Sequence, residues 1–436
     1  MLCDIAKIGQ LYKKELLKKI PNLPSKYFIM VSPLKEQHRK EVLHIELDLY
    51  AETIHDVYVA DITFDEHEMM LKIPKIYVNS QKRFPSLFIA TSGDVIDYIN
   101  KTIKAIAKYL HIPVSDEFIA QLANKIKEAN EQVQKQKKKN QKENKIMIPV
   151  LLRLYDRQKD RYVFPGELTG FWDFWEQQIE EILSIKKTTN NVFSCVHTDK
   201  PITAVELSRA LKFATYDKKG FVLNFDENKA KHVDVETFLY IFKGWEILRN
   251  ATKNDTHLQN LVIIPSMSAD SIAEIINAVR WAMDPNIKTL SFLVRNHPEL
   301  KYTILFVNEN KSEVKVKTLW YDVFPSRLNN VQQVFEKVTG KPARLQVILN
   351  ELKALSDDIR IYQNFGVGKQ TLYLLFLTKL FIGQQLWTDY AMRKTYTTLY
   401  REDIDTSRKK QRQKNKKEHK QSIRSMLSLL QYINQI

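Results

Sequence analysis

The chain has 436 residues, of which 44% are hydrophobic and 11% aromatic, so it can bury substantial cores and is not a disordered chain. This length exceeds what one hydrophobic core usually supports, and we expect two or three domains. The 67 lysines and arginines exceed the 51 aspartates and glutamates and give a net charge of +16. The ten glycines fall well below the usual share of about 7%, which disfavours Rossmann and P-loop enzymes, since these hold nucleotides in glycine-rich loops.

The cysteine content and the N-terminal sequence predict a reducing, cytoplasmic compartment. Cys3 and Cys195 are too few for a disulfide framework, and residues 1–19 carry charges where a signal peptide needs an apolar region. The longest apolar stretch, Leu372 to Leu386, contains a threonine and a lysine and is too short to cross a bilayer. We expect it to form a buried helix, and we expect no membrane partner.

The first part of the chain alternates between helical and strand patterns. Residues 1–20 predict an amphipathic helix that ends before Pro21. The alternation between residues 27 and 59 predicts strands, in which His44, Glu46 and Asp48 lie on an outward polar face. Further strands are expected near 70–78, 86–90 and 146–156, and helices over 94–110, 116–134 (with Ser115 as N-cap) and 170–185.

The pattern beyond residue 260 separates an α+β body from a helical C-terminal part. The expected elements are a strand at 261–264, a helix at 269–283 and a hairpin of 302–307 with 314–320. They complete an α+β body over residues 1–328. From Val331 the apolar residues recur at i, i+3, i+4 and i+7, and the same spacing returns from Leu345 and from Ile423. We therefore predict a separate all-α helical bundle over residues 329–436.

No catalytic or metal-binding motif stands out. Residues 366–371, GVGKQT, look like a phosphate-binding loop, but Gln363 and Gln370 occupy the positions that need a glycine and a hydroxyl. We interpret this segment as a glycine connection between helices. The groups at 65–68 and 44–48 lack a second pair of metal ligands, and no Ser/His/Asp or Cys/His set is evident. The sequence predicts no enzyme, no cofactor and no metal.

Two short lysine-rich tracts hold most of the positive charge. Residues 135–145 contribute +5 and residues 408–424 contribute +8, which together make +13 of the +16. Such a concentration of charge most often meets a polyanion, and nucleic acid is the commonest one, although a lysine run can also be only a solvated face. A folded ridge of this kind makes salt-sensitive, sequence-independent phosphate contacts. The candidate residues are Lys409, Lys410, Arg412, Lys414, Lys416, Lys417, Lys420, Lys137, Lys138 and Lys139.

Three segments carry a family likeness. Residues 212–221 read KFATYDKKGF, residues 322–328 read DVFPSRL, and the apolar helix from Leu372 ends at Gly383. These segments resemble the large subunit of type I-B CRISPR Cascade complexes, in which the phrases KFYTxDKxGF and DVxPSRL occur. The likeness is spread over most of the chain.

The family brackets the first of these segments with two Cys-x-x-Cys pairs that hold zinc, and this chain departs from that pattern. It has Cys195-Val196-His197 at the first position and Asp234-Val235-Glu236-Thr237 at the second. One thiolate and one imidazole at the wrong spacing do not make a tetrahedral zinc site. We therefore predict a metal-free element over residues 193–248. Its expected core residues are Phe213, Phe221, Phe238 and Trp245.

The resemblance implies a non-catalytic role in a complex that also contains crRNA and Cascade backbone subunits. The α+β body would bind the crRNA 5′ end and inspect the motif flanking the target double-stranded DNA, with Lys82 and Arg83 as candidates. The helical part resembles Cascade small subunits and would stabilise the R-loop, while base pairing reads the sequence. A recruited helicase-nuclease, or recruited transposition proteins, would act on the DNA.

The alternative function is a standalone basic nucleic-acid-binding protein, such as an RNA-processing or repair factor. Two observations would discriminate it from a Cascade subunit. They are the identity of the neighbouring genes and whether a crRNA of defined length co-purifies with the protein. A third class, a nuclease that depends on a metal or a nucleotide, is disfavoured because the residues of such a site are missing.

Overall fold

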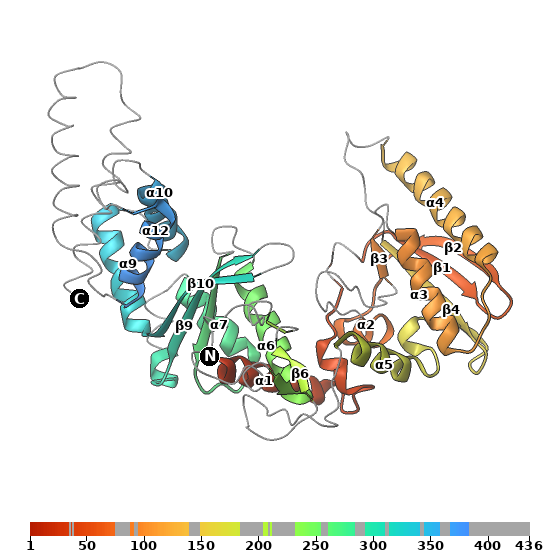
Figure 1. Cartoon of the computed structure of the whole chain (residues 1–436), viewed down its shortest axis with the longest axis horizontal. Coiled ribbons are helices and arrows are strands. Elements are labelled where there is room, and N and C mark those ends of the chain that lie inside the picture. Colours follow the sequence, from red (N-terminus) through yellow and green to blue (C-terminus); the bar gives the residue numbers. More distant parts are fainter. Residues whose placement is uncertain are drawn as a thin grey trace, which may run out of the picture. The chain divides into compact units, whose positions relative to one another are not determined.

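Figure 1 shows a computed structural model of the chain. It describes residues 1–34, 36, 39–74, 88–90, 95–138, 149–183, 204–207, 210–211, 232–253, 260–283, 293–309, 314–340, 344–357 and 367–382. These residues divide into two compact units. One comprises residues 1–12 with the described residues from Tyr240 onward, and the other comprises the described residues between Lys13 and Leu239.

The unit between Lys13 and Leu239 is built on a five-stranded sheet. The strands are β1 (Val42–Asp48), β2 (Thr53–Ala60), β3 (Phe88–Ala90), β4 (Pro149–Asp156) and β5 (Arg161–Val163). They follow the order β2-β1-β4-β3, and β5 pairs with β4 outside this path. β1 and β4 are parallel, and the other pairs are antiparallel.

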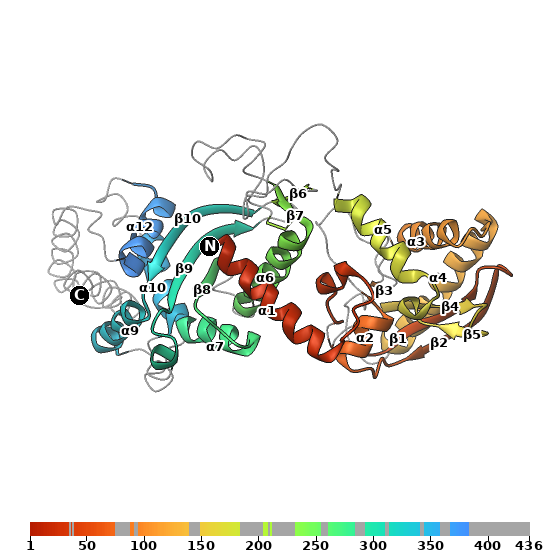
Figure 2. The same cartoon turned by 90° about the horizontal axis from the view of Figure 1, so that it is seen from below.

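Two helices, α3 (Val95–Tyr109) and α4 (Asp116–Lys138), cover one face of this sheet (Figures 1 and 2). The prediction that Ser115 caps α4 is confirmed, because its Oγ accepts a hydrogen bond from the backbone N–H of Phe118 at 3.2 Å. The N–H and the hydroxyl of Ser115 also donate to the carboxylate of Glu52, at 2.6 and 2.7 Å. These bonds attach the start of α4 to the turn between β1 and β2.

The prediction that His44 and Glu46 lie on an outward face is wrong. His44 is only 4% exposed and Glu46 only 9%. The physical reason is that side chains from outside β1 cover this side of the sheet, among them Phe164, whose ring lies edge-on to that of His44 with centroids 6.4 Å apart. The His44 ring stacks on Tyr58, with ring centroids 5.0 Å apart and planes inclined by 7°. Burial lowers the pKa of His44, which keeps its imidazole neutral.

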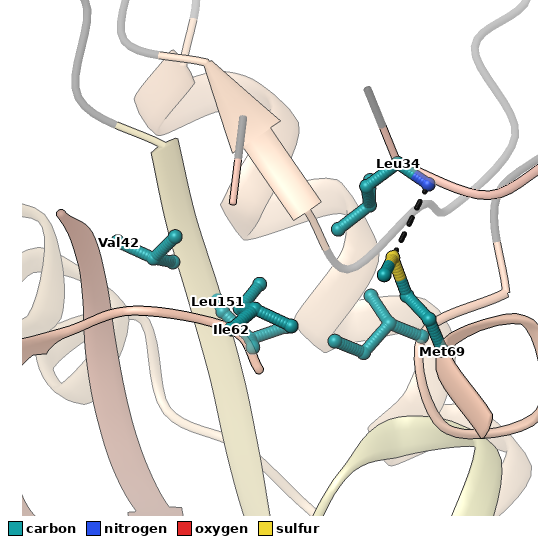
Figure 3. Close-up of a cluster of buried hydrophobic side chains, with 6 residues drawn as sticks. Leu34, Val42, Ile62, Met69 and Leu151 are labelled. Carbon is teal, nitrogen blue, oxygen red and sulfur yellow. Dashed lines mark hydrogen bonds between the residues drawn. The ribbon is translucent and has the colours of Figure 1, made fainter. Parts of the chain in front are cut away.

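A hydrophobic cluster lies next to His44, on the same side of the sheet as its ring. Val42 of β1 and Leu151 of β4 pack with Ile62, Met69 and Leu34 (Figure 3). The backbone N–H of Leu34 lies 3.3 Å from the Met69 sulfur. Because Met69 belongs to α2 (Glu66–Lys72), this cluster attaches α2 to the sheet.

The strand expected near 70–78 is wrong over its first residues, which belong to α2, while residues 75–78 lie outside the described part. The cause is a strong helix start at Asp65. Its Oδ1 accepts hydrogen bonds from the backbone N–H groups of His67 and Glu68, both at 2.8 Å. The acidic group at 65–68 is therefore a helix cap.

The strand expected from residue 27 is wrong at its start, because residues 26–30 form the short helix η1, in which the Ser25 side chain accepts from the backbone N–H of Tyr27. The other described elements agree with the expected ones where a prediction was made. They are α1 (Leu2–Lys19), the short helix η1 (Lys26–Met30), η3 (Pro165–Glu167), α5 (Phe171–Leu183), β6 (Ala204–Glu206), β7 (His232–Asp234), α6 (Val235–Lys253), β8 (Leu261–Ser266), α7 (Ile272–Met283), β9 (Lys301–Glu309), β10 (Val314–Val323), α9 (Pro325–Thr339), α10 (Leu345–Asp357) and α12 (Lys369–Ile382). Mixed α+β content is thus confirmed.

The second unit contains a three-stranded antiparallel sheet in the order β10-β9-β8, which confirms the hairpin of β9 and β10. Helix α12 is attached to it, because Trp320 Nε1 of β10 donates to Thr378 Oγ1 at 3.1 Å. Arg327 of α9 donates to the backbone oxygens of Lys379 and Leu380, at 2.9 and 3.1 Å. An independent bundle over 329–436 stays a prediction, since residues 383–436 lie outside the described part.

Two glycines let α1 and α6 approach closely within this unit. A Cβ atom on Gly9 would meet the backbone oxygen of Tyr240 at 2.0 Å, and a Cβ atom on Gly244 would meet that of Ile5 at 2.0 Å. Both obstacles are backbone atoms, which cannot rotate away. The contact therefore requires glycine on both helices, and it joins the start of the chain to the elements that follow Tyr240.

We expect Gly9→Ala to destabilise this unit by about 2 kcal/mol or more, because the added methyl group forces two helices apart. Denaturant unfolding followed by circular dichroism measures the change. Gly368→Ala is the matched control, since no atom lies within 4 Å of the position of its Cβ. Equal stability of the two variants would contradict the close contact.

Candidate nucleic-acid interface

The structure leaves the role of the predicted basic residues untested. Lys137 and Lys138 lie in the last turn of α4, where only the backbone is described. The other candidates lie outside the described residues: Lys139, Lys82, Arg83, and Lys409, Lys410, Arg412, Lys414, Lys416, Lys417 and Lys420 of the C-terminal tract. Their contact with nucleic acid stays a prediction.

Helix α4 continues well beyond Ile126, the last of its residues that the structure describes as buried. Phe118, Leu122 and Ile126 are buried along its first half. The helix ends at Lys138 (Figure 1), twelve residues beyond Ile126 (126 to 138), which is about 18 Å at the rise of an α-helix. Lys127, at the start of this extension, is exposed. The first lysine tract therefore begins on a regular helix.

A second candidate surface, which the sequence did not reveal, lies on the sheet. We call it the sheet face and define it by His55, Tyr58, Arg153, Tyr155 and Tyr162. Arg153 is the cross-strand partner of Glu46, and Tyr162 is the partner of Tyr155. Because cross-strand partners and alternate residues of a strand share one side of a sheet, these side chains lie together. This is also the side on which His44 and Glu46 lie.

A β-bulge turns His55 onto the sheet face. β2 has one residue more than β1 between the partners of Glu46 and Leu47, so His55 has no partner in β1. Its imidazole stacks on Tyr162, with ring centroids 5.0 Å apart and planes inclined by 22°. The ring of Tyr162 in turn lies 5.4 Å from that of Tyr155. Three rings from β2, β4 and β5 thus form one continuous row.

Arg153 of β4 holds three strands of the sheet face together. Its Nη1 pairs with the carboxylate of Glu46 in β1 and donates to the Tyr58 hydroxyl in β2 at 2.8 Å. Its Nη2 donates to the backbone oxygen of Tyr162 in β5 at 3.1 Å. The side chains of Arg153 and Glu46 are 25% and 12% exposed, so water shields this pair only weakly.

The sheet face continues onto two turns. Because β1 and β4 are parallel, the turns that follow these strands leave the same end of the sheet. Arg157 of the second turn stacks on Tyr50 of the first, with its guanidinium carbon 3.7 Å from the ring centre. Arg157 and Arg161 are exposed, and Tyr50 is half-buried. An aromatic ring with an arginine over it therefore lies at this end of the sheet.

Carboxylates balance the arginines around the sheet face. Asp160 accepts a hydrogen bond from the Tyr155 hydroxyl, and this bond raises the pKa of Tyr155. Burial, and then the charge of Asp48, raise the pKa of Tyr162. Both phenols therefore stay neutral. A ligand would meet aromatic rings and neutral hydrogen-bonding hydroxyls here.

The region that resembles the zinc element of the family contains a helix cap at its second cysteine position. Asp234, the last residue of β7, accepts hydrogen bonds from the backbone N–H and the hydroxyl of Thr237, at 2.8 and 2.7 Å. These bonds start α6. Among the residues that the structure describes, no group of three or more His, Cys, Asp or Glu side chains could hold a metal ion.

The predicted packing of this element can be followed only in α6. Phe238 is fully buried there, and Trp245 is half-buried. Cys195, His197, Phe213 and Phe221 lie outside the described residues. The packing of Phe213, Phe221, Phe238 and Trp245 in place of a metal ion therefore stays a prediction.

Comparisons with known proteins give no family for the chain. No family model matches it, and no curated protein is significantly similar to it. Within the described ranges, no helix is long and apolar enough to cross a membrane. The apolar stretch from Leu372 forms α12, and its residues Phe376, Leu377 and Leu380 are buried as predicted.

We expect Arg153→Met to destabilise its unit by about 3 kcal/mol, because the Glu46 carboxylate is left buried without its partner. The double variant Arg153→Met, Glu46→Gln should recover much of this loss, since it removes the charge that lacks compensation. Denaturant unfolding of the wild type, of Arg153→Met, of Glu46→Gln and of the double variant measures the coupling. Additive losses would contradict a direct interaction between the two side chains.

Proposed function

We propose that the chain is a non-catalytic nucleic-acid-binding protein that acts as the large subunit of a crRNA-guided surveillance complex. The observation that carries the binding proposal is the row of rings on the sheet face, in which His55 stacks on Tyr162 and Tyr155 lies tilted beside Tyr162. The assignment to a Cascade complex rests on the resemblance of residues 212–221 and 322–328.

Stacked rings on a sheet are suited to single strands. Unpaired bases stack on aromatic side chains, which contributes about 1–3 kcal/mol per base and needs no particular sequence. In a duplex the flat faces of the bases are already covered. We therefore infer that the sheet face binds an unpaired segment, which in the proposed complex is the crRNA or a strand opened in the target DNA.

The lysine tracts would supply the electrostatic part of the same function. The sheet face is electrically balanced, because Arg153 is paired with Glu46 and Asp160 lies beside Tyr155. Steering of a polyanion then depends on the tracts at 135–145 and 408–424. In this division of labour, phosphate contacts and ring stacking come from different parts of the chain.

The proposed partners follow from the resemblance. They are crRNA, target double-stranded DNA, the Cascade backbone subunits, and a recruited helicase-nuclease or transposition machinery. The protein would recognise the flanking motif and stabilise the R-loop while the recruited proteins act on the DNA. A standalone RNA-processing or repair factor is the second candidate function, because the sheet face and the lysine tracts would serve single-strand binding equally well outside a complex.

We expect the double variant His55→Ala, Tyr162→Ala to bind a single-stranded oligonucleotide at least about tenfold more weakly than the wild type, since two stacking rings are lost. The slope of affinity against salt concentration should stay unchanged, because neither residue contacts a phosphate through a permanent charge. Fluorescence anisotropy at several salt concentrations measures both quantities.

The control for this variant is His67→Ala, Tyr321→Ala, which removes one imidazole and one exposed phenol outside the sheet face. It should bind like the wild type. If both double variants bind as tightly as the wild type, the sheet face is not the interface. If both lose affinity equally, the effect does not belong to the stacked rings.

The assignment to a complex has its own test. When the chain is purified from its natural source through an affinity tag, we expect it to bring along an RNA of uniform length, together with several other subunits. A protein that arrives with RNAs of many lengths and without other subunits would support the standalone factor. A magnesium-dependent cut in DNA by the isolated chain would contradict the non-catalytic role.

A further inference from the structure

An open groove lies between the sheet of β8 to β10 and the helices α10 and α12, within one compact unit. Its volume is about 310 Å³, which is at the lower end of the range for small-molecule sites. Its lining combines three kinds of groups. They are the amides of Asn260, Asn350 and Gln370, the charged groups of Lys353, Lys369 and Asp357, and the ring of Tyr373.

The charges of the groove favour an anion. Lys353 of α10 and Lys369 of α12 line it with one carboxylate, that of Asp357, which leaves an excess of one positive charge. Lys369 Nζ lies 3.9 Å from Asp357 Oδ1, and both side chains are more than half exposed, so this ion pair is weak. Lys353 forms no ion pair with any residue that the structure describes.

The floor of the groove favours a flat ring. Tyr373 is half-buried, and its ring lies 5.9 Å from that of Phe306 in an edge-to-face arrangement. Burial raises the pKa of Tyr373 to about 12, so its hydroxyl stays a neutral donor. The three amides can each both donate and accept hydrogen bonds, as the edge of a nucleobase requires.

Two of these residues belong to the segment that looks like a phosphate-binding loop. Gly368 accepts the hydrogen bond from the backbone N–H of Leu372 that opens α12, and Lys369 and Gln370 follow in its first turn. The segment lacks the P-loop hydroxyl, so it does not hold magnesium in the manner of an ATPase. Lys369 nevertheless lines the groove together with Lys353 of α10. The sequence alone does not show that these two lysines share a groove.

We propose that this groove binds a nucleoside monophosphate group, with the phosphate at Lys353 and Lys369 and the base against Tyr373 and the amides. The group can be a free nucleotide or the phosphorylated end of a strand, because the chemistry is the same. The site is separate from the sheet face, and the proposal does not depend on the proposed function.

Calorimetric titration of the full chain with adenosine monophosphate, adenosine and inorganic phosphate tests the proposal. We expect adenosine monophosphate to bind at least about tenfold more tightly than adenosine, because charge-assisted hydrogen bonds to the phosphate are lost in adenosine. It should also bind more tightly than inorganic phosphate, which lacks the base. Equal affinity for adenosine monophosphate and adenosine would overturn the proposal.

Substitutions locate the binding. Lys353→Glu, or Lys353→Gln if the first variant folds poorly, should weaken adenosine monophosphate binding about tenfold or more. Lys337→Glu is the matched control, because Lys337 is an exposed lysine of the neighbouring helix α9 that does not line the groove. An unchanged affinity in both Lys353 variants, or an equal loss in Lys337→Glu, would refute the site.

Two further titrations separate the sources of the ligand and the two sites. A 5′-phosphorylated oligonucleotide that displaces adenosine monophosphate better than its 5′-hydroxyl form identifies a strand end as a ligand, whereas no difference between them assigns the groove to free nucleotides. His55→Ala, Tyr162→Ala should bind adenosine monophosphate like the wild type. A loss in that variant would assign nucleotide binding to the sheet face and contradict the groove.

Discussion

The guanidinium of Arg153 fixes the surface on which the proposed function depends. It links β4 to Glu46 of β1, to Tyr58 of β2 and to the backbone of β5, so three neighbours share one cation. Planar, five-donor geometry makes arginine suited to this role, and lysine could not satisfy the three acceptors in the same way. With these strands held in register, the bulge in β2 brings His55 against Tyr162, and the row of rings forms.

Much of the helical part of the fold could be predicted from local signals. Ser115 caps α4 as expected, and α12 is buried as its apolar stretch indicated. The outward placement of His44 failed because alternation reveals two faces and does not tell whether side chains of other elements cover the second, as Tyr58 and Phe164 do here. The strand expected from residue 70 failed because the Asp65 side chain caps a helix there, and the local cap outweighs the apolar pattern that follows.

The sheet face could not be predicted, because it depends on long-range pairing. His55 and Tyr162 are more than one hundred residues apart, and their contact requires both the bulge in β2 and the pairing of β5 with β4. The groove between α10 and α12 shows the same limit, since Lys353 and Lys369 come from different helices. Tracts of like charge are visible in a sequence, whereas sites that combine single residues from several elements are not.

The central claim is that unpaired bases stack on the sheet face while lysines contact phosphates. Ultraviolet crosslinking of the full chain to a single strand, followed by mass spectrometry of the attached peptides, tests it most directly, because such crosslinks form between bases and the rings that touch them. We predict crosslinked nucleotides on peptides that contain His55 and Tyr155 to Tyr162. Crosslinks confined to the tracts at 135–145 and 408–424, with none on β2, β4 or β5, would contradict the account.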